Sequence, residues 1–377
     1  MKSSVSNVLI IGGGFSGMTA AIELRKRNIE TDLVEIDENW RTDGAGISIG
    51  GATLRAFKTI GILDEFLEQG HAHNGLDLFA PHGLHLAHVP TPSVANAEGI
   101  PGAGAIMRPT LAKILAEKTL ASGANVRLGC TYKEMVNTDE GVEVSFTDGT
   151  TKTYDLVIGA DGVHSQVRKD VFPEVEAPKY IGQGVWRAVL PKLPEVKNTM
   201  MWVGPHLKVG VNPMSKDEMY LFLTEDKKER PKYDPATYVE KLKELMGTFP
   251  APMVNQFKDM LNENSLIDFR ALGNLLVPAP WHRKRVVLIG DTVAATTPHL
   301  ASGACIGIES AIVLAEELAK DVTVEQALNS FLERRWERCR MVVENSARLC
   351  HIEIEGGDKE EHTQIMRESI IALAQPI

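Results

Sequence analysis

The stretch Val8-Leu-Ile-Ile-Gly12-Gly-Gly14-Phe-Ser-Gly17 decides the fold, because an apolar, β-branched run leads directly into spaced glycines. The run predicts a buried strand over residues 5–11, and the following residues predict a helix over 15–27. A second strand is expected over 31–35, which completes a βαβ unit of roughly 30 residues. The chain therefore begins with the unit that binds dinucleotides in many enzymes.

Each glycine of this unit has its own expected task. Gly12 permits the tight turn, Gly14 lets a pyrophosphate approach the backbone, and Gly17 lets the helix pack closely on the strand. The N–H groups that open the helix would face the phosphate charge. Glu35 ends the second strand about 20 residues on, where a carboxylate would accept bonds from ribose hydroxyls. The predicted cofactor residues of this unit are Gly12, Gly14, Phe15, Ser16, Gly17, Glu35 and Ile36.

Composition narrows the class of protein. The chain has 377 residues, 44% of them hydrophobic and 24% charged, with a formal net charge of −10. No basic stripe is present to neutralise phosphates, so we expect no nucleic-acid partner. The four cysteines form no CxxC pair, so we expect no metal site. No apolar stretch reaches the roughly 18 residues that span a bilayer, so we expect no membrane partner and a cytoplasmic location.

The pattern along the chain predicts two interlocked α/β parts. Helices are expected over 52–69 and 331–347, and short β-like runs fill 178–270. The strand expected over 285–289 is apolar and β-branched, like residues 5–11. We therefore expect a Rossmann-like binding domain, an inserted β-sheet substrate domain and C-terminal helices. The expected bounds are 1–177 with 271–345, then 178–270, then 346–377.

Two later motifs separate NAD-binding from FAD-binding proteins. Asp161-Gly162 ends a strand and precedes a helix, and Gly290-Asp291 follows the strand 285–289. Together with the first motif, and in the same order, they resemble the para-hydroxybenzoate-hydroxylase-like family of single-component (class A) flavoprotein monooxygenases. The resemblance extends to about residue 345 and is closest to the urate, 6-hydroxynicotinate and salicylate hydroxylases.

The resemblance implies FAD as the cofactor and assigns residues to it. Asp291 matches the aspartate that binds the ribityl chain, and Arg108 matches an arginine at a helix start beside FAD. Asp161 and Gly162 match a motif that serves FAD and NAD(P)H. Further residues that the resemblance places near the isoalloxazine are Arg41 and Gly46 in one loop, and Pro298, Gly303 and Ala304 in another.

The chain departs from the family pattern at one loop. The family usually has Gly-Asp-Ala-Ala-His followed by Gly-Gln-Gly, whereas this chain has Gly290-Asp-Thr-Val-Ala294 and Ala301-Ser-Gly303. FAD binding is still expected, because the Gly-Asp pair is kept. A helix that starts near Ser302 would still direct its N–H groups at the flavin.

The resemblance also implies the reaction. NADH or NADPH would reduce FAD, dioxygen would form a C4a-hydroperoxyflavin, and its distal oxygen would hydroxylate a small aromatic or heteroaromatic substrate. No second GxGxxG unit is present, so the nicotinamide donor would bind transiently. The chain would then be an FAD-dependent NAD(P)H:O₂ oxidoreductase, as a monomer or a homodimer.

The inserted strands offer candidates for contact with the substrate. Lys208 and Tyr220 are the nearest matches to a basic residue and a tyrosine in urate and hydroxynicotinate hydroxylases, and His206 is a candidate base. Alternation along the strands also suggests Trp202 and Phe222 as pocket lining. The alternatives are that Lys208 is a solvated strand residue, His206 a loop histidine and Tyr220 part of the core.

Three other functions stay open on the sequence. A related monooxygenase could perform epoxidation, decarboxylative hydroxylation or antibiotic modification. A flavin-dependent reductase or dehydrogenase would use another acceptor and would turn over without dioxygen. A non-catalytic dinucleotide-binding module would show no substrate-stimulated NAD(P)H oxidation, although simple binding does not need both Asp161 and Asp291.

Overall fold

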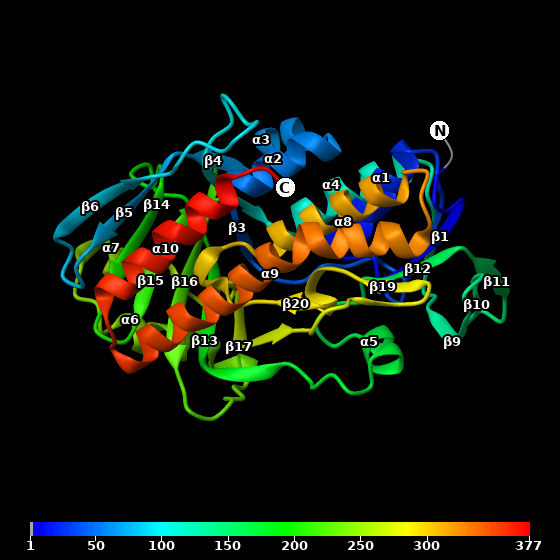
Figure 1. The fold of residues 1–377 in the computed structure, drawn as a ribbon. Coiled ribbons are helices and arrows are strands. Elements are labelled where there is room, and N and C mark those ends of the chain that lie inside the picture. The colour runs from blue at the N-terminus through cyan, green and yellow to red at the C-terminus, as the bar shows by residue number, and fades with distance from the viewer. Residues whose placement is uncertain (1–2) are drawn as a thin grey trace.

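The computed structural model describes residues 3–377, and its first layer is a mainly parallel sheet of six strands (Figure 1). The order is β18-β19-β12-β1-β2-β8, and only β18 is antiparallel to its neighbour. The strands are β1 (Asn7–Ile11), β2 (Glu30–Glu35), β8 (Asn125–Leu128), β12 (Leu156–Gly159), β18 (His282–Arg283) and β19 (Val286–Leu288). The predicted Rossmann-like fold class is confirmed.

Helices cover this sheet, and the first of them follows directly after the predicted glycine loop. The helix α1 (Phe15–Lys26) contacts both α4 (Arg108–Ala121) and α8 (Gly303–Leu318), while the short α5 (Gln166–Val171) follows β12. Most of α8 is buried, because its residues are predominantly apolar all round. The single helix expected over 52–69 is two helices, α2 (Gly51–Ile60) and α3 (Leu63–Gln69), because Gly61 ends the first in a left-handed conformation.

The second layer is a sheet of eight strands, in the order β20-β17-β13-β16-β15-β14-β5-β6. They are β5 (Gly75–Phe79), β6 (His85–Pro90), β13 (Lys179–Pro191), β14 (Thr199–Val203), β15 (Lys208–Pro213), β16 (Glu218–Asp226), β17 (Ile267–Leu276) and β20 (Ala294–Ala295). The strands β5 and β6 precede the expected insert 178–270 in the chain. They nevertheless join its sheet, because β5 pairs in parallel with β14. The division into domains at 178 and 270 stays a prediction.

The two faces of this sheet have different partners. Trp186 and Trp202 point to the face covered by α6 (Tyr238–Met246) and α7 (Pro252–Met260), where they are fully buried. Trp202 stacks on Phe79 at a centroid distance of 4.9 Å. Because side chains alternate along a strand, Tyr220 lies on the opposite face. The prediction that Trp202 lines the substrate pocket is therefore wrong, since its face is filled by core.

Two small sheets and two long helices complete the fold. One sheet contains β3 (Gly46–Gly50), β7 (Ala103–Met107) and β4 (His71–His73), and the other contains β9 (Tyr132–Asn137), β10 (Val142–Phe146) and β11 (Thr151–Tyr154). The helix α9 (Val324–Glu355) crosses the front of the molecule, and α10 (Lys359–Ala374) runs back along the second sheet (Figure 1). The expected boundary at 345 thus falls inside α9. Within residues 3–377, no helix is long and apolar enough to cross a membrane.

Candidate cofactor and substrate site

The glycine loop between β1 and α1 has the shape that its sequence predicts. A Cβ on Gly12, whose φ is +107°, would lie 2.5 Å from the carbonyl oxygen of Ala160. A Cβ on Gly17 would lie 2.0 Å from the carbonyl oxygen of Gly12. Gly14 is exposed, and a Cβ there would meet nothing within 4 Å. Backbone contact therefore fixes the first and third glycines, while the second leaves room for a diphosphate.

Glu35 is held beside this loop at the end of β2. Its carboxylate accepts hydrogen bonds from the backbone N–H of Gly13 (2.7 Å) and of Asp37 (2.9 Å). The indole of Trp40 donates to the carbonyl of Gly13 (2.8 Å), a contact that the sequence pattern did not reveal. Arg41 is exposed and donates to Asp37 (3.1 Å). Ile36 is also exposed, at 73% of its surface.

The Asp161-Gly162 turn is joined to the Gly-Asp loop through Thr292. The backbone N–H of Gly162 donates to the Thr292 hydroxyl (3.1 Å), and Arg168 donates to the Thr292 carbonyl (2.9 Å). The Asp161 carboxylate accepts from Ser165 Oγ (2.5 Å), the N-cap residue of α5, and from Gln166 N (2.7 Å), the first N–H group of that helix. The second and third motifs therefore form one hydrogen-bonded unit at the carboxyl edge of the first sheet.

The first motif meets the third at Ser16. A Cβ on Gly290 or on Gly307 would lie 2.4 Å from Ser16 Oγ, so α1, the Gly-Asp loop and α8 converge there. The side chain of Asp291 next to this junction is accessible to solvent, although protein surrounds it deeply. Burial raises the pKa of this carboxyl group, and the nearby Arg108 opposes the shift. Asp291 thus lines a recess instead of the outer surface.

Arg108 opens α4 on the other side of this recess. Its guanidinium lies 5.0 Å from the Phe15 ring centroid, and Gly44 lies between Arg108 and Arg270. Burial lowers the pKa of Arg108, Arg270 lowers it further, and Asp291 opposes the shift. Among residues 3–377, no hydrogen bond engages this guanidinium. A cation in a recess without an acceptor is suited to a ligand that supplies one.

The loop before α8 leads into a helix that contacts the 3-10 turn Gly290–Thr292 of the Gly-Asp loop. Pro298 begins a single 3-10 turn, and α8 starts at Gly303 and Ala304 after Ser302. His299 in this turn points away toward α9: its Nδ1 is 2.9 Å from Thr297 Oγ1, and its Nε2 is 3.3 Å from Glu353. The N–H groups of the first turn of α8 have no intrahelical partner, so they favour negative charge nearby.

Tyr220 meets this region from the second sheet. Its ring lies flat on Gly46, where a Cβ would be 2.1 Å from Tyr220 Cδ1. The Tyr220 hydroxyl bonds to Ser48 Oγ, which accepts from Asn212 Nδ2 (2.9 Å). Asn212 Oδ1 in turn accepts from Thr199 Oγ1 (3.0 Å). The phenol is therefore fixed by a buried polar network, next to apolar side chains of Ala105, Met107, Val189, Met214 and Phe222.

Replacing Gly46 with alanine is expected to displace the Tyr220 ring and to lower the free energy of unfolding by about 1–3 kcal/mol, because the new methyl group overlaps the ring. Thermal and urea unfolding would measure the loss. In a Tyr220→Ala background the same change should cost much less, since the clash is gone. Gly50→Ala is the matched control on the same strand, because a Cβ there meets nothing within 4 Å. Equal costs at Gly46 and Gly50 would contradict this packing.

The other two substrate candidates lie apart from Tyr220. Lys208 Nζ forms an ion pair with Glu353 Oε1 (2.6 Å), which is also 3.3 Å from His362 Nε2. Burial alone would raise the pKa of Glu353. Lys208 and His299 lower this pKa by more than burial raises it, so the net shift is downward. His206 is exposed in the turn between β14 and β15. The structure therefore brings Tyr220 together with the predicted cofactor residue Gly46. It leaves Lys208 at the first position of β15 and His206 in the turn before that strand.

Comparison with known proteins decides the family. The family described as "FAD binding domain" matches residues 5–348. The chain belongs to this family. FAD is the cofactor of this flavoprotein, and the match together with monooxygenase relatives confirms the predicted flavoprotein monooxygenase membership.

Relatives with known names support the same grouping. The flavoprotein is 30% identical to the 2-heptyl-3-hydroxy-4(1H)-quinolone synthase of Pseudomonas aeruginosa, over 82% of this chain and 79% of the relative. It is 27% identical to the 3-amino-4-hydroxybenzoate 2-monooxygenase of Streptomyces cremeus, over 91% and 86%. The fold is similar to that of Klebsiella pneumoniae HpxO in complex with FAD and uric acid, with a TM-score of 0.83 at 22% identity, covering 98% of this chain and 92% of that one.

The surroundings of several predicted residues fit parts of FAD. The open space over Gly14 and the N-terminus of α1 suit the diphosphate, and Glu35 is at hand for the adenosine ribose. Asp291 and Arg108 line the recess that follows, where ribityl hydroxyls and the ring would lie. The individual contacts of these residues with FAD stay predictions.

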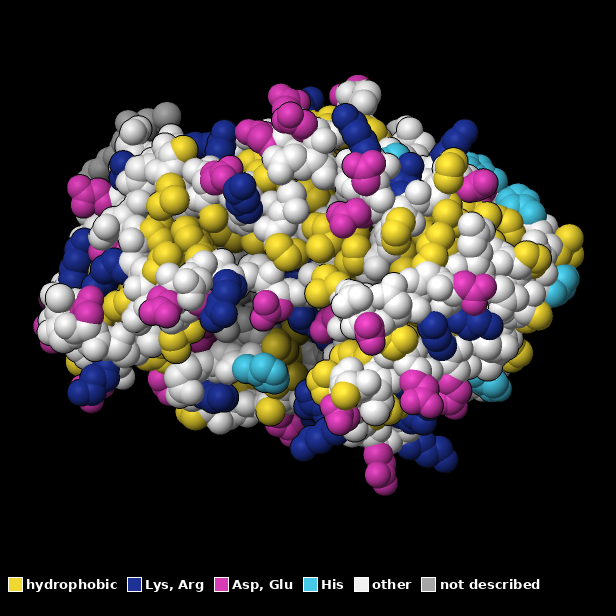
Figure 2. Space-filling view, turned by 180° about the vertical axis from the view of Figure 1, so that it is seen from behind, with side chains coloured by type: hydrophobic (Ala, Val, Ile, Leu, Met, Phe, Trp, Pro, Cys, Tyr) yellow, Lys and Arg dark blue, Asp and Glu magenta, His cyan; other side chains and the backbone are white. Residues whose placement is uncertain are grey.

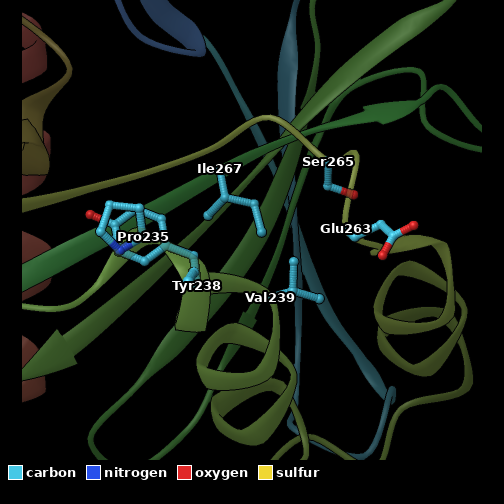
Figure 3. A pocket seen from close by; sticks show the side chains of 7 residues that line it. Pro235, Tyr238, Val239, Glu263, Ser265 and Ile267 are labelled. Carbon is cyan, nitrogen blue, oxygen red and sulfur yellow. The ribbon is translucent and has the colours of Figure 1, made fainter.

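Two cavities elsewhere in the flavoprotein do not include any predicted site residue. One of about 430 Å³ lies against α6, lined by Tyr238, Val239 and Ile267 among others (Figure 3). Ile267 alternates with Asp268 on β17, so this cavity is on the opposite face of the sheet from Tyr220. The other, of about 730 Å³, lies between β17 and α9. Figure 2 shows a hollow near the centre of the rear face.

Proposed function

We propose that the flavoprotein hydroxylates a small aromatic or heteroaromatic compound, with NADH or NADPH as electron donor and dioxygen as co-substrate. The observation that carries this proposal is the meeting of the cofactor recess at Arg108 and Asp291 with the apolar face around Tyr220. The names of the two relatives describe an enzyme that makes a hydroxyquinolone and one that oxygenates an aminohydroxybenzoate, which supports a flat ring as substrate.

When bound, FAD supplies the redox chemistry, accepting a hydride from the nicotinamide and activating dioxygen. The protein has to hold the ring, keep water away and provide fixed charges. Phe222 and Val189 offer an apolar surface for a ring, and the Tyr220 hydroxyl offers one oriented polar group. Asp291 and the N-terminus of α8 would hold the cofactor from the other side.

The visible absorbance spectrum and NAD(P)H oxidation of the purified protein test this function together. The protein should be yellow after incubation with FAD, and one nicotinamide should be oxidised faster when a phenol, hydroxypyridine or hydroxyquinoline is present. With ¹⁸O-labelled dioxygen, one labelled oxygen atom should appear in a hydroxylated product.

Three outcomes would contradict the proposal in different ways. Turnover under anaerobic conditions with a quinone would indicate a reductase or dehydrogenase. A labelled product that is an epoxide or a modified antibiotic would indicate another monooxygenase reaction. A yellow protein whose NAD(P)H oxidation no aromatic compound stimulates would indicate a binding or sensing module.

A further inference from the structure

The arginine Arg187 on β13 stands on the same sheet face as Tyr220. It is directly opposite Phe222 on β16 and opposite Asp268 on β17. Strand alternation therefore directs Arg187 toward the apolar group around Tyr220 and away from the core behind the sheet. Of the Arg187 side chain, 21% is exposed, so a ligand can reach a group that protein otherwise encloses.

The guanidinium of Arg187 lacks the partners that other enclosed arginines have. Arg168 donates to two backbone carbonyls, and Arg335 donates to Ser310 and to Glu309. Within residues 3–377, no hydrogen bond engages Arg187, and its nearest carboxylate oxygen, on Asp268, is 4.0 Å away. Asp268 is already bonded to Arg270 (2.9 Å). Burial lowers the pKa of Arg187, while Tyr220 and Asp268 raise it, so an added anion would relieve a cost that the apoprotein bears.

The alternative cation on this face is already neutralised. Lys208 lies on the same side of the sheet, but its Nζ forms an ion pair with Glu353 Oε1 at 2.6 Å. Arg270 shares Asp268 and is largely exposed. Arg108 faces Asp291 across the cofactor recess. Among these cations, Arg187 is the one that combines enclosure, an unused set of donors and a place beside the apolar group around Tyr220.

We propose that Arg187 binds the substrate and that the substrate is a flat aromatic compound held with a negatively charged oxygen, either an ionised ring hydroxyl or a carboxylate, against this guanidinium. The ring would lie on Phe222 and Val189, which are only partly buried, and the Tyr220 hydroxyl would contact a second substituent. If the oxygen belongs to a hydroxyl, its proton leaves to solvent and the ring gains the electron density that electrophilic oxygenation needs. This inference rests on the proposed function and narrows its substrate class.

Four related probes separate the two sources of charge. They are 3-amino-4-hydroxybenzoate with both groups, 3-amino-4-methoxybenzoate with the carboxylate only, 2-aminophenol with the hydroxyl only, and 2-methoxyaniline with neither. Each is titrated into the FAD-loaded protein while the flavin absorbance is followed. We expect the wild type to bind at least one of the first three and to bind 2-methoxyaniline weakest.

Arg187→Gln should weaken binding of the preferred anionic probe roughly 10- to 100-fold, the loss expected for a charge-assisted hydrogen bond. Arg187→Lys should fall between, because it keeps the charge without the planar donors. FAD content and melting temperature should stay near the wild type. Arg340→Gln is the matched control, since Arg340 is a surface arginine that pairs within α9.

Several results would overturn this inference. They are unchanged probe binding in Arg187→Gln, loss of FAD from that variant, preference for 2-methoxyaniline, and no response to any probe at millimolar concentrations. The proposed function fails separately, in the labelled-dioxygen experiment. An enzyme that hydroxylates a ring equally well with and without Arg187 would keep that function and lose only this inference.

Discussion

Replacing Asp291 with alanine is expected to weaken FAD binding roughly 10- to 150-fold, because one or more charge-assisted hydrogen bonds to the cofactor are lost. Asp291 lies in the recess next to Arg108 and, in residues 3–377, has no side-chain hydrogen bond of its own. Its acceptor capacity is therefore available to ribityl hydroxyls. The ratio of flavin to protein after gel filtration, and FAD titration by fluorescence quenching, would measure the loss.

The apoprotein provides an internal check on this result. Burial raises the pKa of Asp291, which means that the folded apoprotein disfavours its charge. Removing the carboxylate should therefore leave the unfolding temperature of the apoprotein unchanged or slightly raised, while FAD binding falls. Asp321→Ala, at an exposed position after α8, is the control and should retain flavin. An Asp291→Ala protein with full flavin absorbance would remove the residue from the cofactor site.

Replacing Glu309 with glutamine is expected to destabilise the fold by about 3–5 kcal/mol, because it leaves buried arginines without their counter-charge. The Glu309 carboxylate is fully buried in α8 and accepts from Arg55 (3.2 Å), Arg335 (3.0 Å) and Arg338 (2.7 and 2.8 Å). Arg338 also donates to the carbonyls of Ala372 (2.9 Å) and Leu373 (2.8 Å) at the end of α10. The change should therefore also loosen the C-terminal helix.

Urea unfolding at several pH values would test this cluster. Burial alone would raise the pKa of Glu309. Arg335, Arg338 and Arg55 lower this pKa by more than burial raises it, so the net shift is downward. A carboxyl group with a lowered pKa stabilises the fold above its unfolded pKa, and this stabilisation is lost as pH falls through the folded value. The gap between wild type and Glu309→Gln should accordingly narrow in acid. Glu333→Gln, exposed on α9, should change stability by less than about 0.5 kcal/mol; equal effects of the two variants would refute the cluster's role.

The glycine loop could be predicted because its main causes are local. Gly12 has a positive φ of +107°, and a Cβ on Gly17 would meet the carbonyl of Gly12; the contact of Gly12 with Ala160 comes from the tertiary structure. The role of Asp291 was implied by the family resemblance, and the structure agrees in bringing the carboxyl ends of β1, β12 and β19 to one edge of a parallel sheet.

The sequence by itself determined the cofactor-binding unit and which side chains share a face of each strand, because glycine sterics and the two-residue repeat act over a few positions. Only the tertiary structure decided that Lys208 is neutralised by a glutamate 145 residues away, and that the hydroxyl of Tyr220 bonds to Ser48, 172 residues earlier in the chain. Within residues 3–377 it also left the Arg187 guanidinium without a hydrogen bond, 4.0 Å from the Asp268 carboxylate. These outcomes depend on which distant charges and surfaces come within a few ångströms, and no local pattern encodes that.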